Sequence, residues 1–410
     1  MSTCIWYVSK YVAPPGSGTA GGRGYLLMKE LARMGHKAVI ITSDSNQLAT
    51  PPQLKDGFLL QEVDGIQLWW VRTLKYTVAK SMRRILSWLH FEWRLLWLPI
   101  KNLPRPDVVV VSSLSLLTIL NGFWWKIRYN CRLIFEIRDI WPLTITEEGG
   151  FKPSNPFVWG LGVVERLGYK YADAIVGTMP NLGEHVHNVL GYSRSTHCIP
   201  MGIDADLYAA PSALPEGYEE TNFPKDKFIV AHVGSIGITN ALDTFLECAQ
   251  AMSASPNIHF LVVGDGDLRE TYLRQYAHLT NLTFAPRVAK SMVQTVLSRC
   301  DLLYFSVHVS KVWEYGQSLN KVIDYMMAGK PVLASYTGFP TMINEAGCGS
   351  YVPAGDVTAL KNEVERYEQM PDEERFVIGA RGKNWLLANR QYPKLATDYL
   401  AIMLDSKVPA

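Results

Sequence analysis

Glycines gather at three places where a predicted strand gives way to a helix or a tight turn. The first is the loop GSGTAGGRG at residues 16–24, the second is VGSIG at residues 233–237, and the third is GDG at residues 264–266. Because glycine has no Cβ, backbone N–H groups can approach a phosphate or sugar oxygen, and a helix N-terminus adds partial positive charge. None of the three loops has the Gly-Lys-Ser/Thr ending of a Walker A loop. They could cradle a nucleotide, or they could be flexible loops and ordinary tight turns.

Short apolar runs alternate with helical patterns along the whole chain. In the first half we predict strands in residues 4–12, 37–43, 65–72, 107–113, 132–139, 174–180 and 197–203. In the second half we predict strands in residues 228–236, 259–266, 282–288, 301–307, 331–336 and 350–355. Runs of this kind indicate parallel sheets with helices on both faces. We therefore predict an α/β fold of two doubly wound, Rossmann-like domains that face each other across a cleft, where the strands end.

The segment between Asp204 and Lys227 is rich in proline, glutamate and small residues, and it has no sustained period, which is typical of a linker. We place one domain at residues 1–204 and the other at residues 205–385. Residues 386–410 are predicted to be helical and could pack back on the first domain. At roughly 150 residues per domain, a chain of 410 residues is long enough for two such cores.

The composition excludes several classes of protein. A formal net charge of +2 argues against a dedicated nucleic-acid binder, and 48% apolar residues argue against disorder. The six cysteines stand far apart without a CxxC pair, so they predict neither a zinc site nor a disulfide framework. The first residues lack the pattern of a signal peptide, which favours a cytosolic location. Residues 108–125 carry no charge and could span a membrane, but their serines favour a strand, a turn and a helix start.

The segment 314–331, EYGQSLNKVIDYMMAGKP, resembles the late signature of retaining glycosyltransferases of the GT-B fold, specifically family 4. The family's other motifs recur here in order, and together they span nearly the whole chain. They are GTAGGRG (18–24), IPMGID (199–204), VGSIG (233–237), GDG (264–266) and IDYMMAGKPV (323–332), of which the last is the most specific. Within the family the chain is most similar to bacterial enzymes that build O-antigen or capsule sugars.

The resemblance implies a role for each matching residue. Arg287 and Lys321 would supply positive charge to the diphosphate leaving group, since departure of a glycosyl diphosphate places negative charge on its oxygen. Asp324, where the family usually has glutamate, would hydrogen-bond the ribose hydroxyls. Each of these three could instead be a solvated surface charge. The predicted donor-binding residues are Gly21, Gly22, Gly234, Ser235, Gly264, Arg287, Ser318, Leu319, Asn320, Lys321 and Asp324.

The sequence departs from the family pattern at three places. Gly316 stands where the first of two acids is expected, and Glu314 lies two residues away from that position. Ser235 and Asn240 replace an arginine and a lysine that usually contact phosphate. No acidic cluster indicates a metal site, so we expect an enzyme that needs no metal or other cofactor.

A third departure is Arg138, which replaces the usual histidine of the N-terminal domain. Arg138, Asp139 and Trp141 end a predicted strand, where residues of the cleft lie in this architecture. Arg138 and Asp139 could form a structural ion pair or could orient the acceptor hydroxyl or the donor sugar, and we favour the second interpretation. The predicted catalytic residues are Arg138, Asp139, Arg287 and Lys321. A metal pair of His185 and His187 is not expected, because the two would face different sides of a helix.

Residues 69–105 hold five of the twelve tryptophans and eight basic residues against one acid, a local charge of +7. Within them, residues 80–98 predict a basic amphipathic helix, whose apolar face is formed by positions 82, 85, 86, 89, 93, 96 and 97. Such a helix is typical of one that lies in the plane of a membrane, although a helix packed in the core is the alternative. The predicted membrane-binding residues are Trp88, Trp93, Trp97, Arg83 and Arg84.

These observations lead to one hypothesis and two alternatives. The hypothesis is a transferase, peripheral on the inner face of the cytoplasmic membrane, that moves a sugar from a nucleotide donor, expected to be UDP-linked HexNAc or deoxy-HexNAc, to a polyprenyl-diphosphate-linked acceptor. Residues 1–204 would bind the acceptor and residues 205–385 the nucleotide sugar. The expected partners are thus the nucleotide sugar, the lipid-linked acceptor and an anionic membrane, and no nucleic acid. The alternatives are a UDP-sugar 2-epimerase of the same fold and an inactive binding subunit of a transferase complex.

Overall fold

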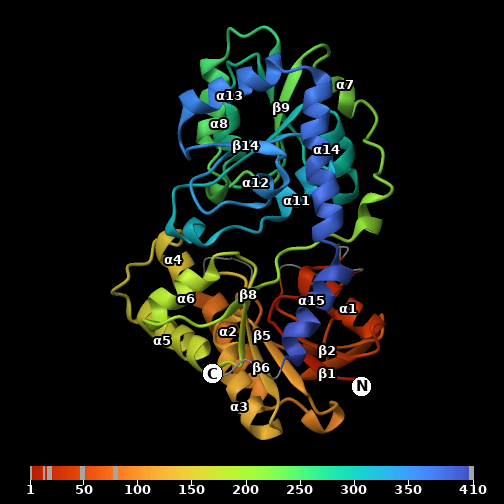
Figure 1. The fold of residues 1–410 in the computed structure, drawn as a ribbon, viewed down its shortest axis with the longest axis vertical. Coiled ribbons are helices and arrows are strands. Elements are labelled where there is room, and N and C mark those ends of the chain that lie inside the picture. Colours follow the sequence, from red (N-terminus) through yellow and green to blue (C-terminus); the bar gives the residue numbers. More distant parts are fainter. Residues whose placement is uncertain (1, 13, 16–20, 47–50, 77–81, 406–410) are drawn as a thin grey trace. The chain divides into compact units, whose positions relative to one another are not determined.

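The computed structural model describes residues 2–12, 14–15, 21–46, 51–76 and 82–405, and it divides the chain into two compact units. Unit 1 consists of Met1–Gly202 and Tyr392–Ala410, and unit 2 of Ile203–Gln391. Each unit is a sheet of mainly parallel strands with helices on both faces (Figure 1). The predicted fold class of two Rossmann-like α/β domains is therefore confirmed.

Unit 1 contains an eight-stranded sheet in the order β3-β4-β2-β1-β5-β6-β7-β8. The strands are β1 (Cys4–Val8), β2 (Lys37–Ser43), β3 (Phe58–Val63), β4 (Ile66–Val71), β5 (Val108–Ser112), β6 (Arg132–Ile137), β7 (Ala174–Gly177) and β8 (Thr196–Cys198). The helices are α1 (Arg23–Arg33), α2 (Met82–Leu96), α3 (Thr118–Tyr129), α4 (Leu143–Glu147), α5 (Pro156–Tyr171), α6 (Leu182–Leu190) and α15 (Tyr392–Leu404), with short 3-10 turns η1 (Ile100–Asn102) and η2 (Ser113–Ser115).

The edge strand β3 is the one element of this sheet that the sequence analysis did not predict. It pairs antiparallel with β4, while the other neighbouring strands are parallel. Its residues are half-buried or exposed, so the continuous apolar pattern of the inner strands is missing. The signal that could have found it is the dipeptide Asp64-Gly65, since both residues have positive φ and form the two-residue turn of a hairpin.

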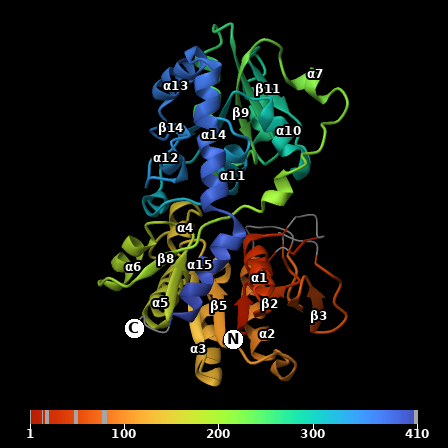
Figure 2. The same cartoon turned by 45° about the vertical axis from the view of Figure 1, so that its right-hand side comes forward.

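The C-terminal helix α15 packs in the core of unit 1 rather than with the segment that precedes it in the chain. Its Tyr392, Leu395 and Tyr399 are buried in one apolar cluster with Tyr25 and Leu31 of α1. Both ribbon views show α15 beside α1 (Figures 1 and 2). The last helix thereby closes the sheet face on which α1 lies.

Unit 2 contains a six-stranded, all-parallel sheet in the order β11-β10-β9-β12-β13-β14. The strands are β9 (Phe228–Val233), β10 (Ile258–Val263), β11 (Leu282–Ala285), β12 (Leu302–Ser306), β13 (Val332–Ser335) and β14 (Gly349–Val352). The helices are α7 (Tyr218–Asn222), α8 (Asp243–Ala251), α9 (Arg269–Gln275), α10 (Val293–Ser298), α11 (Asn320–Met327), α12 (Met342–Ala346), α13 (Val357–Gln369) and α14 (Asp372–Asn389), with 3-10 turns η3 (Ala205–Tyr208), η4 (Ile238–Asn240), η5 (Lys290–Met292) and η6 (Lys311–Tyr315).

The uncharged residues 108–125 form β5, η2 and the start of α3, as the serine pattern predicted. Within the described ranges, no helix has both the length and the hydropathy needed to cross a membrane. The membrane-spanning interpretation of this segment is therefore wrong, because its first residues are a central strand and its helix continues only to Tyr129.

Candidate functional site

The described part of the first glycine loop leads into α1 through Gly21 and Gly22; residues 18–20 of the predicted motif lie outside the described residues. Gly21 has a φ of +106°, a backbone conformation that favours glycine, and Gly22 is the N-cap of α1. Gly24 lies so close to Tyr7 that an added Cβ would come within 2.6 Å of the ring. Glycine is thus required here for close packing as well as for the turn.

Arg23 fixes this loop to two other parts of unit 1. Its guanidinium forms a fully buried ion pair with Glu136 of β6, with an Nη1–Oε2 distance of 2.7 Å. The same group donates to the backbone carbonyls of Ile199, at 2.7 Å, and Pro200, at 3.1 Å. The IPMGID segment and the glycine loop are therefore held together by one arginine, which the sequence analysis did not single out.

The carboxylate of Glu136 is satisfied by three side chains. Besides Arg23, the hydroxyls of Tyr7 and Tyr399 donate to it, at 2.7 and 3.1 Å. Burial acts to raise the pKa of Glu136, but the charges of Arg23 and Arg138 and the hydrogen bonds from Arg23 and Tyr7 together outweigh it, so the pKa lies below its usual value. The pair is thus ionised at neutral pH, and it ties α1, β6 and α15 together.

Arg138 and Asp139 follow directly after β6, at the end of the sheet where the predicted site lies. Both backbone amides donate to the hydroxyl of Ser113 in η2, at 2.9 and 3.3 Å, and this hydroxyl donates to the carbonyl of Asp139. Among the described residues no ion pair joins the Arg138 and Asp139 side chains, and Asp139 is exposed. The turn is therefore held through its backbone, and its side chains remain accessible.

In unit 2, the glycines of the second and third loops meet at the ends of β9 and β10. A Cβ added to Gly264 would lie 1.8 Å from the carbonyl oxygen of Gly234, so the two backbones are in direct contact. Gly266 lies against Ile236 in the same way. Ser235, between them, is exposed. The two loops form one surface of backbone at the end of the sheet.

Lys321 lies at this surface. It belongs to the first turn of α11, its Cε is 3.9 Å from the Cβ position of Gly234, and its amine donates to the side-chain oxygen of Asn240. Burial lowers the pKa of Lys321 to about 8. Asn240, which departs from the family pattern by replacing a lysine, thus binds Lys321 of a different element. The sequence predicted Lys321 as a site residue but not this contact.

The N-terminus of α11 adds further donors. Leu319 is the N-cap, Asn320 and Ser318 flank it, and no side chain caps the helix. The first backbone N–H groups of an uncapped helix point outward and carry partial positive charge, which suits a phosphate. Gln317, just before them, is only 7% exposed, and neither amide atom has a hydrogen-bond partner among the described residues. A ligand hydroxyl could donate to Oε1, and a hydroxyl or phosphate oxygen could accept from Nε2.

Asp324 lies one turn further along α11 and already has two partners. Lys290 contacts both carboxylate oxygens, at 2.5 and 2.6 Å, and the hydroxyl of Tyr208 donates to Oδ1 at 2.8 Å. Neither partner has a signal in the sequence, because they lie 34 and 116 residues away. The structure thus shows Asp324 as a buried, paired carboxylate rather than a solvated surface acid.

The remaining predicted residues of unit 2 are more dispersed. Arg287 follows β11 and is exposed, with no ion pair to the other predicted residues in the described part of the chain. Gly316 has a φ of +101° and is buried, so a glutamate at this position would strain the backbone. Glu314 lies in η6 and is exposed. Glu314 therefore does not take the place of the missing acid inside the protein.

The tryptophans of the basic stretch separate into two groups. Trp69 and Trp70 of β4 and Trp88 of α2 are buried, whereas Trp93 and Trp97 are 52% and 65% exposed. Trp88 donates to the hydroxyl of Tyr11 at 2.8 Å. The prediction that Trp88 binds a membrane is therefore wrong. Position 88 is not part of the predicted apolar face, and Trp88 lies on the buried side of α2 with Phe91 and Leu95.

The exposed face of α2 is nonetheless apolar. It is formed by Leu86, Leu89, Trp93, Leu96 and Trp97, each at least half exposed. Arg83 on this helix is exposed, and the Arg84 guanidinium lies 5.1 Å from the Trp88 ring centre. The single acid of α2, Glu92, accepts hydrogen bonds from Ser115, Thr118 and Asn121 and is thus used internally.

Metal ligands do not gather in the described part of the chain: its His, Cys, Asp and Glu residues form no group of three that could hold an ion. His185 instead contacts the buried Glu165, with an Nε2–Oε1 distance of 2.7 Å. All six cysteines are free.

Two family models match the chain. Residues 25–207 match the model described as Glycosyltransferase Family 4, and residues 227–369 match Glycosyl transferases group 1. No curated protein matches the chain significantly.

Several solved structures have the same fold over the whole chain. Sucrose-phosphate synthase from Thermosynechococcus elongatus has a TM-score of 0.70 at 17% identity, and 98% of each chain is covered. HepE of Anabaena, in complex with UDP and glucose, has a TM-score of 0.66 at 14% identity, with 98% of this chain and 99% of that chain covered. A trehalose-6-phosphate protein of E. coli, bound with UDP-2-fluoro glucose, has a TM-score of 0.72 at 13% identity and the same coverage. The chain is therefore a glycosyltransferase of the GT-B fold, built from a family 4 domain and a group 1 domain.

Proposed function

We propose that this glycosyltransferase moves a sugar, HexNAc or deoxy-HexNAc, from a UDP-linked donor to a polyprenyl-diphosphate-linked acceptor at a membrane surface. The anomeric configuration is retained, and the product is an intermediate of a surface polysaccharide such as O-antigen or capsule. Unit 2 binds the donor and unit 1 binds the acceptor.

The donor assignment is supported by the cluster at the ends of β9 and β10. Lys321, the N–H groups at the start of α11 and the backbone of Gly234 and Gly264 present positive charge and donors to one region of unit 2. These groups suit the diphosphate of a nucleotide sugar, and HepE binds UDP and glucose on the same fold.

The chemistry that these groups support is departure of the diphosphate. The bond between the anomeric carbon and the diphosphate oxygen breaks, the acceptor hydroxyl oxygen bonds to that carbon, and the proton of the hydroxyl passes to the departing diphosphate. Negative charge develops on the departing oxygen, where Lys321 and the helix N-terminus stabilise it. Asp324 would accept from the ribose hydroxyls, with Lys290 and Tyr208 holding its carboxylate in place. No step needs a metal ion.

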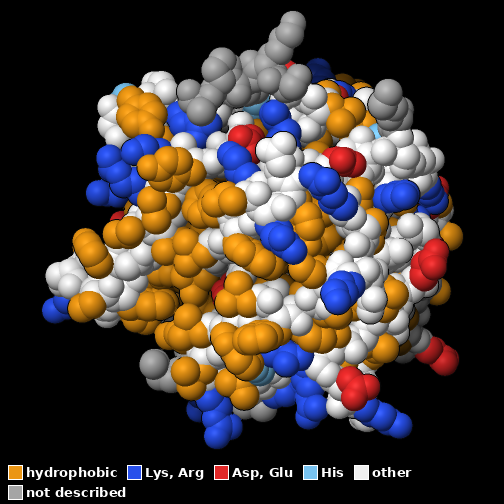
Figure 3. All heavy atoms as spheres, turned by 90° about the horizontal axis from the view of Figure 1, so that it is seen from below, with side chains coloured by type: hydrophobic (Ala, Val, Ile, Leu, Met, Phe, Trp, Pro, Cys, Tyr) orange, Lys and Arg blue, Asp and Glu red, His pale blue; other side chains and the backbone are white. Residues whose placement is uncertain are grey.

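The membrane assignment rests on the exposed apolar face of α2. Its five apolar side chains follow the i, i+3, i+7 spacing of one helix face that no described element covers. Helix α3 contacts α2 and exposes Leu120, Trp124 and Ile127, the last at 84%. Figure 3 views the side of the molecule where α3 lies and shows hydrophobic side chains gathered there, with Lys and Arg around them. A contiguous apolar surface with a basic surround is typical of a protein that docks on an anionic membrane.

Replacing both Trp93 and Trp97 with serine is expected to lower binding to vesicles of mixed neutral and anionic phospholipid about tenfold or more, because two exposed aromatic side chains no longer enter the interface. Vesicle co-sedimentation measures this. The matched control is Trp88→Phe, which changes a buried tryptophan of the same helix and should leave vesicle binding unchanged. Equal loss in both variants, or no loss in the first, would contradict the assignment.

A survey of UDP-sugars tests the function. The purified protein is incubated with each donor and a polyprenyl-diphosphate sugar, and mass spectrometry detects the product. We expect turnover with at least one UDP-HexNAc, and NMR of the product should show the configuration of the donor. Conversion of the UDP-sugar without an acceptor would favour the epimerase. The absence of turnover with every donor would contradict the proposal and favour the inactive subunit.

A further inference from the structure

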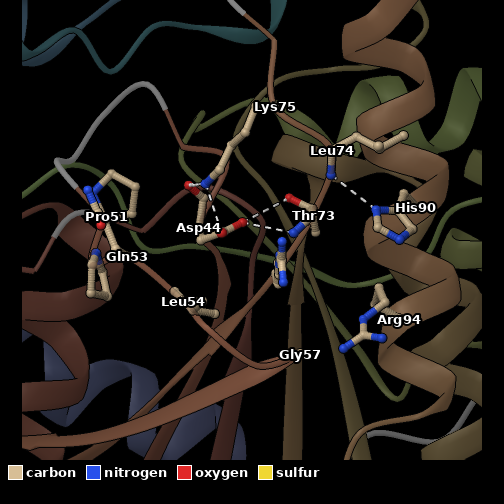
Figure 4. A pocket seen from close by; sticks show the side chains of 12 residues that line it. Asp44, Pro51, Gln53, Leu54, Gly57, Thr73, Leu74, Lys75, His90 and Arg94 are labelled. Carbon is tan, nitrogen blue, oxygen red and sulfur yellow. Dashed lines mark hydrogen bonds and ion pairs between the residues drawn. The ribbon is translucent and has the colours of Figure 1, made fainter.

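A pocket of about 710 Å³ opens in unit 1 where β2 and β4 end (Figure 4). It is lined by residues of the loop after β2, by the segment that follows β4, and by His90 and Arg94 of α2. This volume is within the range of small-ligand sites, roughly 300–1,000 Å³. None of the residues predicted from the family pattern lines it.

The lining carries more positive than negative charge. Arg72, Lys75 and Arg94 stand against a single carboxylate, Asp44. That carboxylate is already used: it accepts from the backbone N–H of Thr73 at 2.8 Å and pairs with Lys75 at 2.8 Å. Figure 4 shows Asp44 with its contacts to Lys75 and Thr73, and His90 and Arg94 on the helix at the right. Two arginines therefore remain to neutralise an anionic ligand.

Arg94 is held in place but has no carboxylate partner in the described part of the chain. Its guanidinium lies 4.5 Å from the ring centre of Phe58, and its Nε is buried without a hydrogen bond. A Cβ at Gly57 would lie 1.9 Å from its Nη2, so the group rests directly on the glycine backbone. In the described part of the chain no carboxylate balances the Arg94 charge, and an anionic ligand in the pocket would balance it.

His90 adds a neutral donor beside Arg94. Its Nδ1 accepts from the backbone N–H of Leu74 at 3.0 Å, so the proton of the neutral ring lies on Nε2. Burial and the neighbouring Arg94 lower the pKa of His90, which favours this neutral form. The helix thus offers a guanidinium and an N–H one turn apart, a set suited to phosphate oxygens.

His90 and Arg94 lie on α2 directly beside the exposed apolar face of that helix. At 3.6 residues per turn, His90 and Arg94 lie on a strip of the helix between the buried Phe91 and the exposed Trp93 and Trp97. A molecule with an anionic head in the pocket would therefore have the exposed apolar face beside it. An ordinary soluble anion would make no use of that face.

We propose that this pocket binds the diphosphate of the polyprenyl-linked acceptor, with the isoprenoid chain running along the apolar face of α2. The proposal rests on the proposed function and gives it a location in unit 1. Arg94 and Arg72 bind the phosphoryl oxygens, His90 donates through Nε2, and the Asp44–Lys75 pair keeps the opening in shape.

Isothermal titration calorimetry with farnesyl diphosphate, a soluble isoprenoid diphosphate, tests this without any donor. We expect Arg94→Gln to weaken binding about tenfold or more, since a charge-assisted hydrogen bond is lost. Gly57→Ala should weaken it as well, because the new Cβ displaces the Arg94 guanidinium while the charge remains. The matched control Lys37→Gln removes one exposed charge at the opposite end of β2 and should bind as the wild type does.

Three further ligands separate the possible sources of the phosphoryl group. Farnesol should bind at least tenfold more weakly than farnesyl diphosphate, and so should inorganic diphosphate and dihexanoyl-phosphatidylglycerol. Inorganic diphosphate binding as tightly would overturn the lipid assignment, and the phosphatidylglycerol binding as tightly would overturn the acceptor assignment. Unchanged binding in both Arg94→Gln and Gly57→Ala would overturn the pocket itself. Thermal melting confirms that each variant is folded.

The calorimetric test of the pocket can succeed or fail independently of whether the protein transfers sugar. If no UDP-sugar is turned over but farnesyl diphosphate binds and loses affinity in the variants, the proposed function fails and the diphosphate pocket stands. If sugar is transferred to a polyprenyl-diphosphate acceptor while Arg94→Gln leaves that acceptor's KM unchanged, the function stands and the pocket assignment fails.

Discussion

Replacing Lys321 with alanine is expected to lower kcat for sugar transfer by about two to three orders of magnitude, while the protein stays folded. The amine lies at the glycine surface of unit 2, within the first turn of α11, where the helix N-terminus also faces. A fixed charge at the departing diphosphate acts mainly in the transition state, so the loss should fall on kcat rather than on KM. The initial rate of UDP release measures it.

The control for this variant is Lys361→Ala, which removes a partly exposed lysine of α13 that pairs with Glu365 one turn along the helix. It should transfer sugar at the wild-type rate. A kcat of Lys321→Ala within threefold of the wild type would show that the lysine does not stabilise the leaving group.

Because of Lys321, we also expect kcat/KM to depend on pH. Its pKa is lowered to about 8 by burial, so its amine is charged below that pH and neutral above it. The kcat/KM value should therefore fall as pH rises through about 8, since kcat/KM reports the free enzyme. His232 nearby contributes no charge in this range, because burial and then Lys321 lower its pKa to about 3. Lys321→Arg keeps its charge and should abolish the fall, and a fall that persists in this variant would assign it to another group.

Replacing Arg23 with methionine is expected to destabilise unit 1 by about 3–5 kcal/mol. The change leaves the Glu136 carboxylate buried without its counter-charge, and two backbone carbonyls lose their donor. Urea unfolding followed by tryptophan fluorescence measures it, because ten of the twelve tryptophans belong to unit 1.

The double variant Arg23→Met with Glu136→Leu separates the ion pair from the packing. It should be clearly more stable than the single variant, since no uncompensated charge remains. Because the pKa of Glu136 lies below its usual value, the contribution of the pair is present at neutral pH and is lost as pH falls through that lowered pKa. Equal destabilisation in the single and double variants would contradict the buried-charge argument.

The sequence predicted the parallel strands well, because both faces of each inner strand are buried and the apolar runs are continuous. It singled out the glycines of unit 2 as a nucleotide cradle or as tight turns, and the structure shows a further reason for them: the backbones of Gly264 and Gly234 are in direct contact. It missed β3, whose exposed residues give no such run.

Long-range partners are the part that the sequence could not predict. Lys290 pairs with Asp324 and Asn240 with Lys321 only because the sheet brings distant loops together. Helix α2 illustrates a second limit. The period of 3.6 identified a helix and an apolar face that does not include position 88, yet Trp88 was counted among the membrane-binding residues for its residue type. The basic residues of α2 also lie in different surroundings, since Arg94 lines a pocket while Arg83 is exposed to solvent.

A comparison of two acceptors tests most directly whether unit 1 binds a lipid-linked diphosphate. With a productive UDP-sugar donor, the initial rate of UDP release is measured for a sugar linked to polyprenyl diphosphate and for the same sugar as a free oligosaccharide. We predict a kcat/KM at least about a hundredfold higher for the lipid-linked acceptor, because the diphosphate and the chain each add binding energy. Equal values for the two acceptors, with the donor turned over in both, would contradict the assignment of a lipid-linked diphosphate as the substrate of unit 1.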